Sequence, residues 1–303
     1  MTMNLDNPNQ LPKIRSADEM LALILSTAQA DERIRAVVLN GSRANPNVVP
    51  DRFQDFDILF VVTDVASFVD VKNWIDRFGE RLIMQTPTLM GDPPPDPGNH
   101  FTYLMQFKDG NRIDLTLVPI DRMADATFES LSILLLDKDN QFTTFPPPSE
   151  SSYFPESPSA KVFEDCCNEF WWVSPYVAKS LARDEIIYGH YLLENVLRPQ
   201  LMLMLTWLFG IKTDFKRNPG KGGKHFREVL SPDRWTLLLE TYSEAEDAAT
   251  WKALFNMGRL FRVCGLEVAD ACEFDYPDQT DHDVRFYLQS IRESIQTPSV
   301  KNI

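Results

Sequence analysis

The sequence predicts a chain of two domains with different fold classes. Residues 1–150 are expected to form an α/β (α+β) domain with a mixed sheet, and residues 151–303 an all-α helical domain. The first part contains short β-branched and apolar runs separated by turn residues, which are typical of strands. The second part contains long segments with the apolar spacing of helices. Between them, residues 145–160 are rich in Pro and Ser, as expected for a linker.

The expected first domain begins with a helix. Ser16 and Glu19 have the spacing of a capping box, and apolar residues follow at helical intervals to about residue 31. Residues 34–39 form a short β-branched run that predicts a strand. Residues 56–62 are almost all apolar, which predicts a central strand covered on both faces. The other expected elements are, in order, a helix over 65–78, strands over 81–85, 101–107 and 112–118, and a helix over 121–135.

Turn residues and prolines mark the other boundaries. Residues 91–98 consist mainly of Pro, Gly and Asp and predict a loop. Asp109 and Gly110, between two strand-like runs, predict a tight hairpin turn. In the second domain, Pro175 and Pro199 fall inside helical segments, which they should kink or split. The helices expected there cover residues 161–182, 184–210, 232–242 and 244–271.

The charge balance limits the classes of function. The formal net charge is −14, and both predicted domains contain more acidic than basic residues. Because binding to a nucleic-acid backbone needs a positive field, this balance disfavours a nucleic-acid partner. It suits a cationic small molecule, although the need for solubility is a sufficient reason for such a charge.

The sequence also indicates a compartment. No apolar segment is long enough to span a bilayer, and residues 1–10 lack the apolar core of a signal peptide. We therefore expect a cytoplasmic protein with no membrane partner, and the sequence leaves its oligomeric state open. The four cysteines lack metal-ligand spacing, so buried thiols are the expected state.

The first candidate site residues follow the strand predicted over 34–39. Gly41 and Ser42, at its exit, can present a hydroxyl and backbone N–H groups to a phosphate. Glycine permits both the turn and a close approach of the ligand. A Gly-Ser pair after a strand is also common as a plain turn, so this pattern is weak by itself.

Three aspartates strengthen this interpretation. Asp55 and Asp57 lie two residues apart at the start of a strand, so both side chains project from one face beside the turn. Adjacent carboxylates repel unless a cation lies between them, and Mg²⁺ is the natural cation where phosphates bind. Asp114 lies on the strand face opposite Ile113 and Leu115, so either that face is solvated or the carboxylate has a function. Together the three aspartates predict a two-metal site for an in-line displacement at phosphorus.

This combination resembles the signature of the polymerase-beta-type nucleotidyltransferases. The signature comprises Gly41-Ser42-Arg43, a spacer, Asp55-Phe56-Asp57 and the later Asp114. The chain is also similar to the aminoglycoside 6-adenylyltransferases, also called streptomycin adenylyltransferases, from about residue 33 to about residue 274. The segments that carry this similarity are 40–45 (NGSRAN), 53–57 (FQDFD), 168–174 (NEFWWVS) and 251–255 (WKALF).

The resemblance implies an antibiotic-inactivating enzyme that moves AMP from ATP to a hydroxyl of an aminoglycoside, with streptomycin as the acceptor, and releases pyrophosphate. It implies a nucleotidyltransferase domain followed by a helical acceptor-binding domain. By the same resemblance, Gly41, Ser42 and Arg43 lie at the nucleotide phosphates, and Asp55 and Asp57 bind Mg²⁺. Asp114 matches the third family carboxylate, which either completes the metal site or helps to deprotonate the attacking hydroxyl.

Four further candidates lie in the second domain. Segment 220–224 (GKGGK) looks like the family's lysine-containing segment, so Lys221 and above all Lys224 are expected to approach the triphosphate; the same segment would also suit a solvated loop. Trp172 is expected to line the acceptor cleft. Neighbouring helix residues diverge by about 100°, so only one of the two adjacent tryptophans can face a cleft. Glu185 is a candidate base or acceptor contact, although an acid at a helix start also complements the helix dipole.

Two other functions stay open on these residues. Nucleotidyl transfer to a different small alcohol, or to a protein side chain, would use the same site. A nucleotide-sensing module without turnover is the non-enzymatic alternative, and the presence of all three carboxylates disfavours it.

Overall fold

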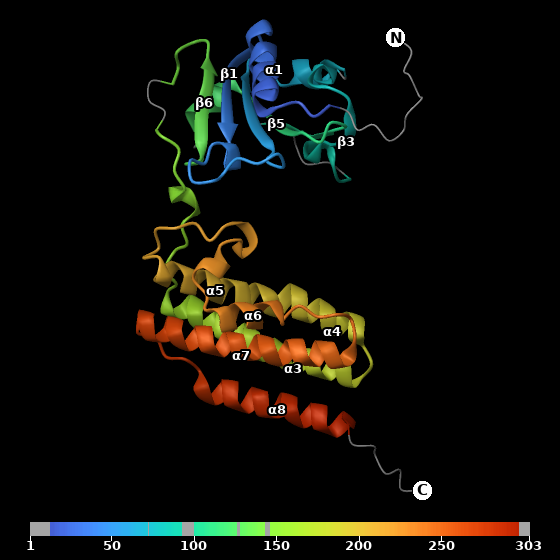
Figure 1. Cartoon of the computed structure of the whole chain (residues 1–303), viewed down its shortest axis with the longest axis vertical. Helices are drawn as coiled ribbons and strands as arrows, with labels where there is room; N and C mark the ends of the chain where they lie inside the picture. The colour runs from blue at the N-terminus through green and yellow to red at the C-terminus, as the bar shows by residue number, and fades with distance from the viewer. Residues whose placement is uncertain (1–12, 72, 93–99, 126–127, 143–145, 297–303) are drawn as a thin grey trace. The chain divides into compact units, whose positions relative to one another are not determined.

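The computed structural model describes residues 13–71, 73–92, 100–125, 128–142 and 146–296. The chain forms two compact units, Met1–Ser152 and Tyr153–Ile303 (Figure 1). Most of the loop expected over 91–98 lies outside the described residues.

The first unit contains a mixed six-stranded sheet with the strand order β3-β4-β5-β2-β1-β6. Only β2 and β5 pair in parallel among these neighbours, and the other pairs are antiparallel. The predicted fold class is therefore confirmed. The strands are β1 (Ile34–Asn40), β2 (Phe56–Val62), β3 (Arg81–Gln85), β4 (Phe101–Phe107), β5 (Arg112–Pro119) and β6 (Ser132–Asp137).

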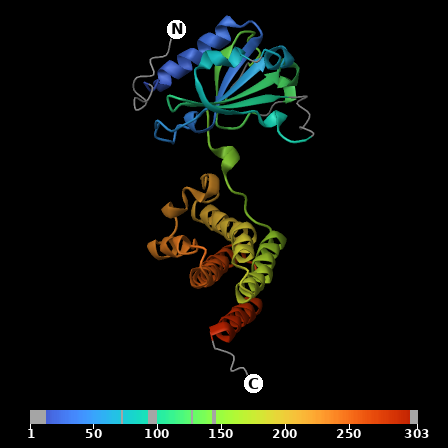
Figure 2. The same ribbon diagram turned by 90° about the vertical axis from the view of Figure 1, so that its right-hand side faces the viewer.

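One face of this sheet forms the core of the unit. Phe56, Ile58 and Phe60 of β2 are buried on it, as alternate residues of a strand must be when one face is covered. Helix α1 (Ala17–Ala30) covers this face, as the blue helix over the sheet in Figure 2 shows. On the opposite face Leu59 is only half-buried, so the expectation that β2 is covered on both faces is wrong for the first part of the strand.

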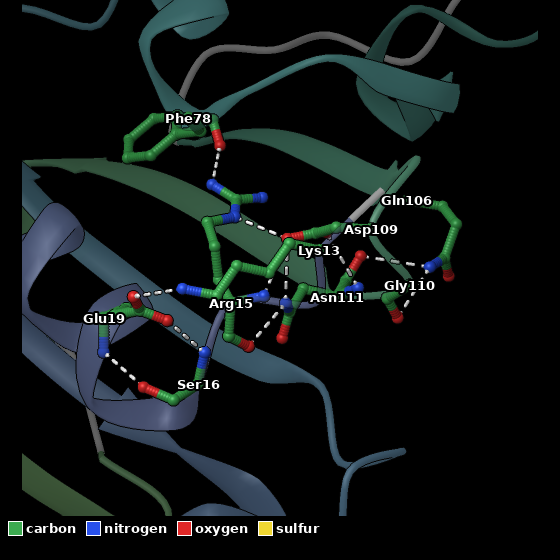
Figure 3. Close-up of polar contacts among 9 residues, drawn as sticks. All are labelled: Lys13, Arg15, Ser16, Glu19, Phe78, Gln106, Asp109, Gly110 and Asn111. Carbon is green, nitrogen blue, oxygen red and sulfur yellow. Dashed lines mark hydrogen bonds and ion pairs between the residues drawn. The ribbon is translucent and has the colours of Figure 1, made fainter. Parts of the chain in front are cut away.

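Polar contacts hold the start of α1 against the β4–β5 hairpin (Figure 3). The expected capping box is present, because Ser16 and Glu19 exchange hydrogen bonds of 3.1 and 2.6 Å with each other's backbone N–H groups. The Arg15 guanidinium bonds Asp109 of the expected Asp-Gly turn at 2.5 Å and the Phe78 carbonyl at 2.6 Å. Although burial opposes it, this contact helps to lower the pKa of Asp109 to about 2. The ion pair between Arg15 and Asp109 thus joins the start of the helix to the hairpin.

Two helices expected in the first unit are wrong. The segment 65–78 forms only the short helix α2 (Ala66–Val69) and a 3-10 turn over 74–78. Within it Trp74 packs edge-on against Phe68, Phe78 and Tyr103, so burial of this side chain outweighs helical continuity.

The second error concerns the segment 121–135. A 3-10 helix covers residues 120–125, and β6 then begins at Ser132 and pairs with β1. The apolar run 133–136 has the composition of a helix, but pairing with the otherwise open edge of β1 makes it a strand.

The second unit is helical, as predicted. Its core includes Phe170 and Phe261, whose rings stack 3.9 Å apart. Helix α8 lies beyond the segments that the sequence predicts. The helices are α3 (Ala160–Ala182), α4 (Ile186–Leu192), α5 (Arg198–Lys212), α6 (Pro232–Leu239), α7 (Asp247–Cys272) and α8 (Asp278–Gln296).

The two prolines have different effects. Pro199 is the second residue of α5. The expected kink or split takes the form of a π-helical turn over 193–197, which interrupts the α-helical hydrogen bonding between α4 and α5 while the backbone stays helical. Pro175 lies inside α3 without splitting it.

Two kinds of feature are absent from the described residues: disulfide bonds and membrane-spanning helices. All four cysteines are free thiols, and burial raises the pKa of Cys167 to about 12, which keeps its thiol protonated. Within the described ranges, every helix is too short or too polar to cross a membrane.

Candidate active site

A row of polar residues crosses four strands on the sheet face opposite the core. In the register of the sheet, Asn40 of β1 lies opposite Ser132 of β6 on one side and Asp57 of β2 on the other. Asp57 lies in turn beside Asp114 of the parallel strand β5. Because neighbouring strands are about 4.8 Å apart, the structure brings together two aspartates that are distant in the sequence. Asp55, one residue before β2, completes the expected set of carboxylates.

The three carboxylates lie close enough for their negative charges to repel one another. The pKa of Asp57 is raised to about 6, first by burial and then by the charges of Asp114 and Asp55. Burial also raises the pKa of Asp55, and the charge of Arg112 opposes this rise. Carboxylates whose charged forms are disfavoured in this way are suited to hold a cation.

Arg112 is the principal site residue that the sequence analysis did not select. Its guanidinium donates two hydrogen bonds of 2.7 Å to the two carboxylate oxygens of Asp114. The same group lies 3.5 Å from a carboxylate oxygen of Asp55. Arg112 and Asp114 are two residues apart in one strand, so their shared face was the available signal. Arg112 therefore holds Asp114 in a fixed orientation.

Gly41 brings the predicted phosphate-binding turn against Asp57. Its φ of +73° is in the left-handed region, and its N–H donates to the Leu131 carbonyl at 3.0 Å. A Cβ atom at this position would lie 2.2 Å from Asp57 Oδ2. Only glycine therefore allows the turn and the carboxylate to approach so closely. Ser42, the next residue of this 3-10 turn, is exposed.

Arg43 holds the end of the loop that separates β1 from β2. Its guanidinium donates to the carbonyl oxygens of Gln54, at 2.7 Å, and Asp55, at 3.0 Å. It also lies over the Phe56 ring, 3.8 Å from the centroid. These contacts fix the position of Asp55 relative to the Gly-Ser turn, a structural role that the sequence does not predict.

The oxygen donors fit a divalent cation at Asp55 and Asp57. Carboxylate oxygens are the ligands that Mg²⁺ prefers. Burial, the charge of Asp114 and the charge of Asp55 raise the pKa of Asp57, and a cation bound by Asp55 and Asp57 would offset the repulsion between these two side chains. In the described part of the chain, no group of three or more His, Cys, Asp or Glu side chains is arranged to hold a metal ion. Each oxygen of Asp114 accepts one hydrogen bond from Arg112, so as a third ligand Asp114 would use its remaining lone pairs, and the Arg112 charge would oppose the binding of a cation there.

The other predicted site residues all belong to the second unit. Lys221 and Lys224 are exposed in the loop that follows Gly220, whose φ is +73°. Trp172 on α3 is 63% exposed, whereas its neighbour Trp171 is buried, so only one of the two tryptophans is accessible, as the helix geometry requires. Glu185 is exposed at the start of α4 and makes no capping hydrogen bond there with its side chain.

Substitution of Arg112 is expected to weaken the site without unfolding it. Arg112→Lys keeps the charge but loses the paired hydrogen bonds to Asp114, so we expect kcat/KM to fall about tenfold. Arg112→Gln also removes the charge that lowers the pKa of Asp57, so we expect a fall of about 100-fold and a pH–rate profile moved to higher pH. Steady-state kinetics of the AMP transfer that the resemblance implies, measured for both variants from pH 5 to 9, would show whether Arg112→Gln loses more activity than Arg112→Lys. Equal activity of the Gln variant and the wild type would exclude a role for the Arg112–Asp114 pair.

The raised pKa of Asp57 also predicts how stability depends on pH. Because this pKa lies above the ordinary value of 3.8, the folded chain binds more protons than the unfolded chain between about pH 4 and pH 6. The free energy of unfolding therefore falls as the pH rises through this window. Without divalent cations, Asp57→Asn should stabilise the protein at pH 7.5 by about 1–2 kcal/mol, a value reduced to allow for partial exposure. Thermal unfolding would show a higher Tm for the variant at pH 7.5 and equal Tm values near pH 4; a lower Tm at pH 7.5 would contradict the electrostatic account.

Comparison with known proteins places the chain in a family. Residues 14–291 match the family model described as streptomycin adenylyltransferase. The chain is 41% identical over 285 residues to an aminoglycoside 6-adenylyltransferase of Bacillus subtilis (strain 168), which covers 93% of this chain and 100% of that protein. It is 40% identical over 265 residues to an aminoglycoside 6-adenylyltransferase of Campylobacter jejuni, covering 87% and 92%. A crystal structure of an aminoglycoside 6-adenyltransferase from Bacillus subtilis is similar with 38% identity and a TM-score of 0.45, over 92% of this chain and 99% of that one.

Proposed function

Because the chain belongs to the streptomycin adenylyltransferase family, we propose that it transfers AMP from ATP to a hydroxyl of an aminoglycoside and that streptomycin is an acceptor. The observation that carries this proposal is the contact between Gly41 and Asp57, beside Asp114. It places a turn suited to phosphate directly against a group of carboxylates suited to a cation. Nucleotidyl transfer needs both elements at one phosphorus atom.

Each group of the site has a task in this reaction. Ser42 and the backbone N–H groups of its turn bind the nucleotide phosphates. Asp55 and Asp57 hold Mg²⁺, which when bound supplies positive charge to the phosphate oxygens. The acceptor hydroxyl attacks the α-phosphorus, the new O–P bond forms, and the bond to pyrophosphate breaks in line with it. The proton of the hydroxyl passes to a carboxylate, and Asp114, oriented by Arg112, faces the same side of the sheet.

The acceptor is proposed to be cationic and to contact the second unit. A net charge of −14 attracts a positively charged small molecule over a long range. Trp172 and Glu185 supply an exposed aromatic face and an exposed carboxylate for such a molecule. Lys221 and Lys224, in the same unit, are proposed to neutralise the triphosphate of ATP.

Mass spectrometry of the acceptor tests the reaction. Streptomycin incubated with the protein, ATP and Mg²⁺ should gain the mass of one AMP, with one pyrophosphate released per acceptor. A panel of other aminoglycosides and small alcohols would show whether the acceptor class is correct. Pyrophosphate release together with labelling of a protein side chain would instead identify a protein acceptor. Binding of ATP and Mg²⁺ in calorimetry without any transfer would identify a nucleotide sensor.

A further inference from the structure

We propose that Asn40 is a further substrate-binding residue, whose side-chain NH₂ group donates a hydrogen bond to a phosphate oxygen of the bound nucleotide. The proposal rests on the nucleotidyl transfer inferred above. It adds a neutral hydrogen-bond donor to the site. This donor is held in place by Ser132 of β6, the strand that pairs with β1 on the side away from β2.

The position of Asn40 satisfies the first requirement. It is the last residue of β1 and directly precedes Gly41 and Ser42. In the register of the sheet it lies opposite Asp57, with its side chain on the face that carries the carboxylates. A group at this point lies between the phosphate-binding turn and the aspartate proposed to hold the cation.

The orientation of the side chain satisfies the second requirement. Ser132 is a buried residue, 3% exposed, and its hydroxyl donates to Asn40 Oδ1 at 2.8 Å. With the carbonyl side held in this way, the NH₂ side of the planar carboxamide must point away from Ser132. Asn40 precedes a 3-10 turn, where an Asn side chain often caps the backbone, but it makes no capping bond here.

The free bonding capacity of the NH₂ group indicates a ligand. Among the residues that the structure describes, none accepts a hydrogen bond from Asn40 Nδ2. The side chain is half-buried, and its NH₂ group is not among the buried side-chain atoms that lack a partner, so this donor is open to a ligand at the site. The ligand expected at the turn and the carboxylates is anionic, and a hydrogen bond to an ionised phosphate is stronger than one to a neutral acceptor. A neutral amide can supply this bond without forming an ion pair that would compete for Asp57.

Nucleotide affinity measured by calorimetry tests the proposal. The probe is a non-hydrolysable ATP analogue with Mg²⁺, and the full-length chain is used. Asn40→Asp keeps the oxygen that Ser132 contacts but replaces the donor with an acceptor, so affinity should fall about 100-fold. Asn40→Ala removes the donor without adding charge and should weaken binding about tenfold. Ser132→Ala keeps the donor but frees its orientation, and its effect should be smaller and in the same direction.

The matched control is Asn73→Asp. Asn73 is exposed in the same unit and makes no capping bond, so this substitution makes the same chemical change outside the site. It should bind the analogue as the wild type does. For the Asn40 and Ser132 variants, but not for Asn73→Asp, the ratio of kcat to KM for ATP should fall while KM for the acceptor stays unchanged, a pattern that a general loss of folding would not produce.

Each outcome decides one of the two proposals. Wild-type affinity in Asn40→Ala would overturn the Asn40 proposal, even if Asn40→Asp binds weakly, because the weak binding would then be charge repulsion. A lower Tm with unchanged affinity would also overturn it in favour of a structural role. If the wild type binds the analogue but transfers no AMP, the proposed function fails and the Asn40 variants still report on binding. If the wild type does not bind the analogue, both proposals fail.

Discussion

Replacing Asp57 by Asn is expected to reduce AMP transfer by about three orders of magnitude or more while the protein stays folded. Asp57 is adjacent to Asp114 across the parallel strands and in contact range of the Gly41 turn. The carboxamide keeps the shape of the side chain but loses the charge that would hold a divalent cation. Because the charged form of Asp57 is disfavoured in the folded chain, the substitution should not destabilise the sheet.

Two measurements separate the loss of chemistry from a loss of folding. Initial rates of pyrophosphate release should fall in Asp57→Asn, and Mg²⁺ with ATP should raise the Tm of the wild type but not of the variant. The matched control is Asp70→Asn, which makes the same change at an exposed position of the first unit. Near-normal transfer by Asp57→Asn would exclude the proposed metal role of this residue.

Replacing Gly41 by Ala is expected to produce the second large effect, a loss of about 100-fold in kcat/KM. The added Cβ atom would lie 2.2 Å from Asp57 Oδ2, so either the carboxylate or the turn must move. A displacement of about 1 Å in a reacting group is enough for a loss of this size. The φ of +73° adds a backbone cost of about 1–2 kcal/mol for any residue with a Cβ atom.

Gly110→Ala separates these two contributions. Gly110, in the β4–β5 turn, also has a left-handed φ, of +87°, but a Cβ atom there would meet nothing within 4 Å. This control should lose similar stability and keep its activity per folded molecule. Kinetics corrected for the folded fraction should therefore distinguish the two variants. Equal activity in both would show that the contact between Gly41 and Asp57 is not needed for catalysis.

Much of the architecture follows from local patterns in the sequence. The capping box at Ser16 and Glu19 and the Asp-Gly turn at 109–110 form as predicted, because each is determined by a few adjacent residues. The alternation that isolates Asp114 from the buried residues of β5 is also correct. These features depend on propensity and periodicity, which a single sequence contains.

The features that sequence reasoning missed depend on contacts between distant segments. The residues 133–136 form a strand because the edge of β1 is available, and nothing in their own composition shows this. The bonds of Arg43 to the Gln54 and Asp55 carbonyls depend on the shape of a long loop. The pairing of Arg112 with Asp114 could have been predicted from the strand periodicity, which places both side chains on one face. The approach of Arg112 to Asp55 could not, because it depends on the register of two parallel strands.

The parallel pairing of β2 with β5 has a consequence for the order in which the chain folds. The β4–β5 hairpin closes a short loop and can form early, whereas Asp57 and Asp114 meet only when this hairpin joins β2 across a long intervening segment. Their mutual repulsion therefore opposes that late, non-local step. Where these two strands pair before the folding barrier is crossed, the charges proposed for catalysis would slow the assembly of the sheet that carries them.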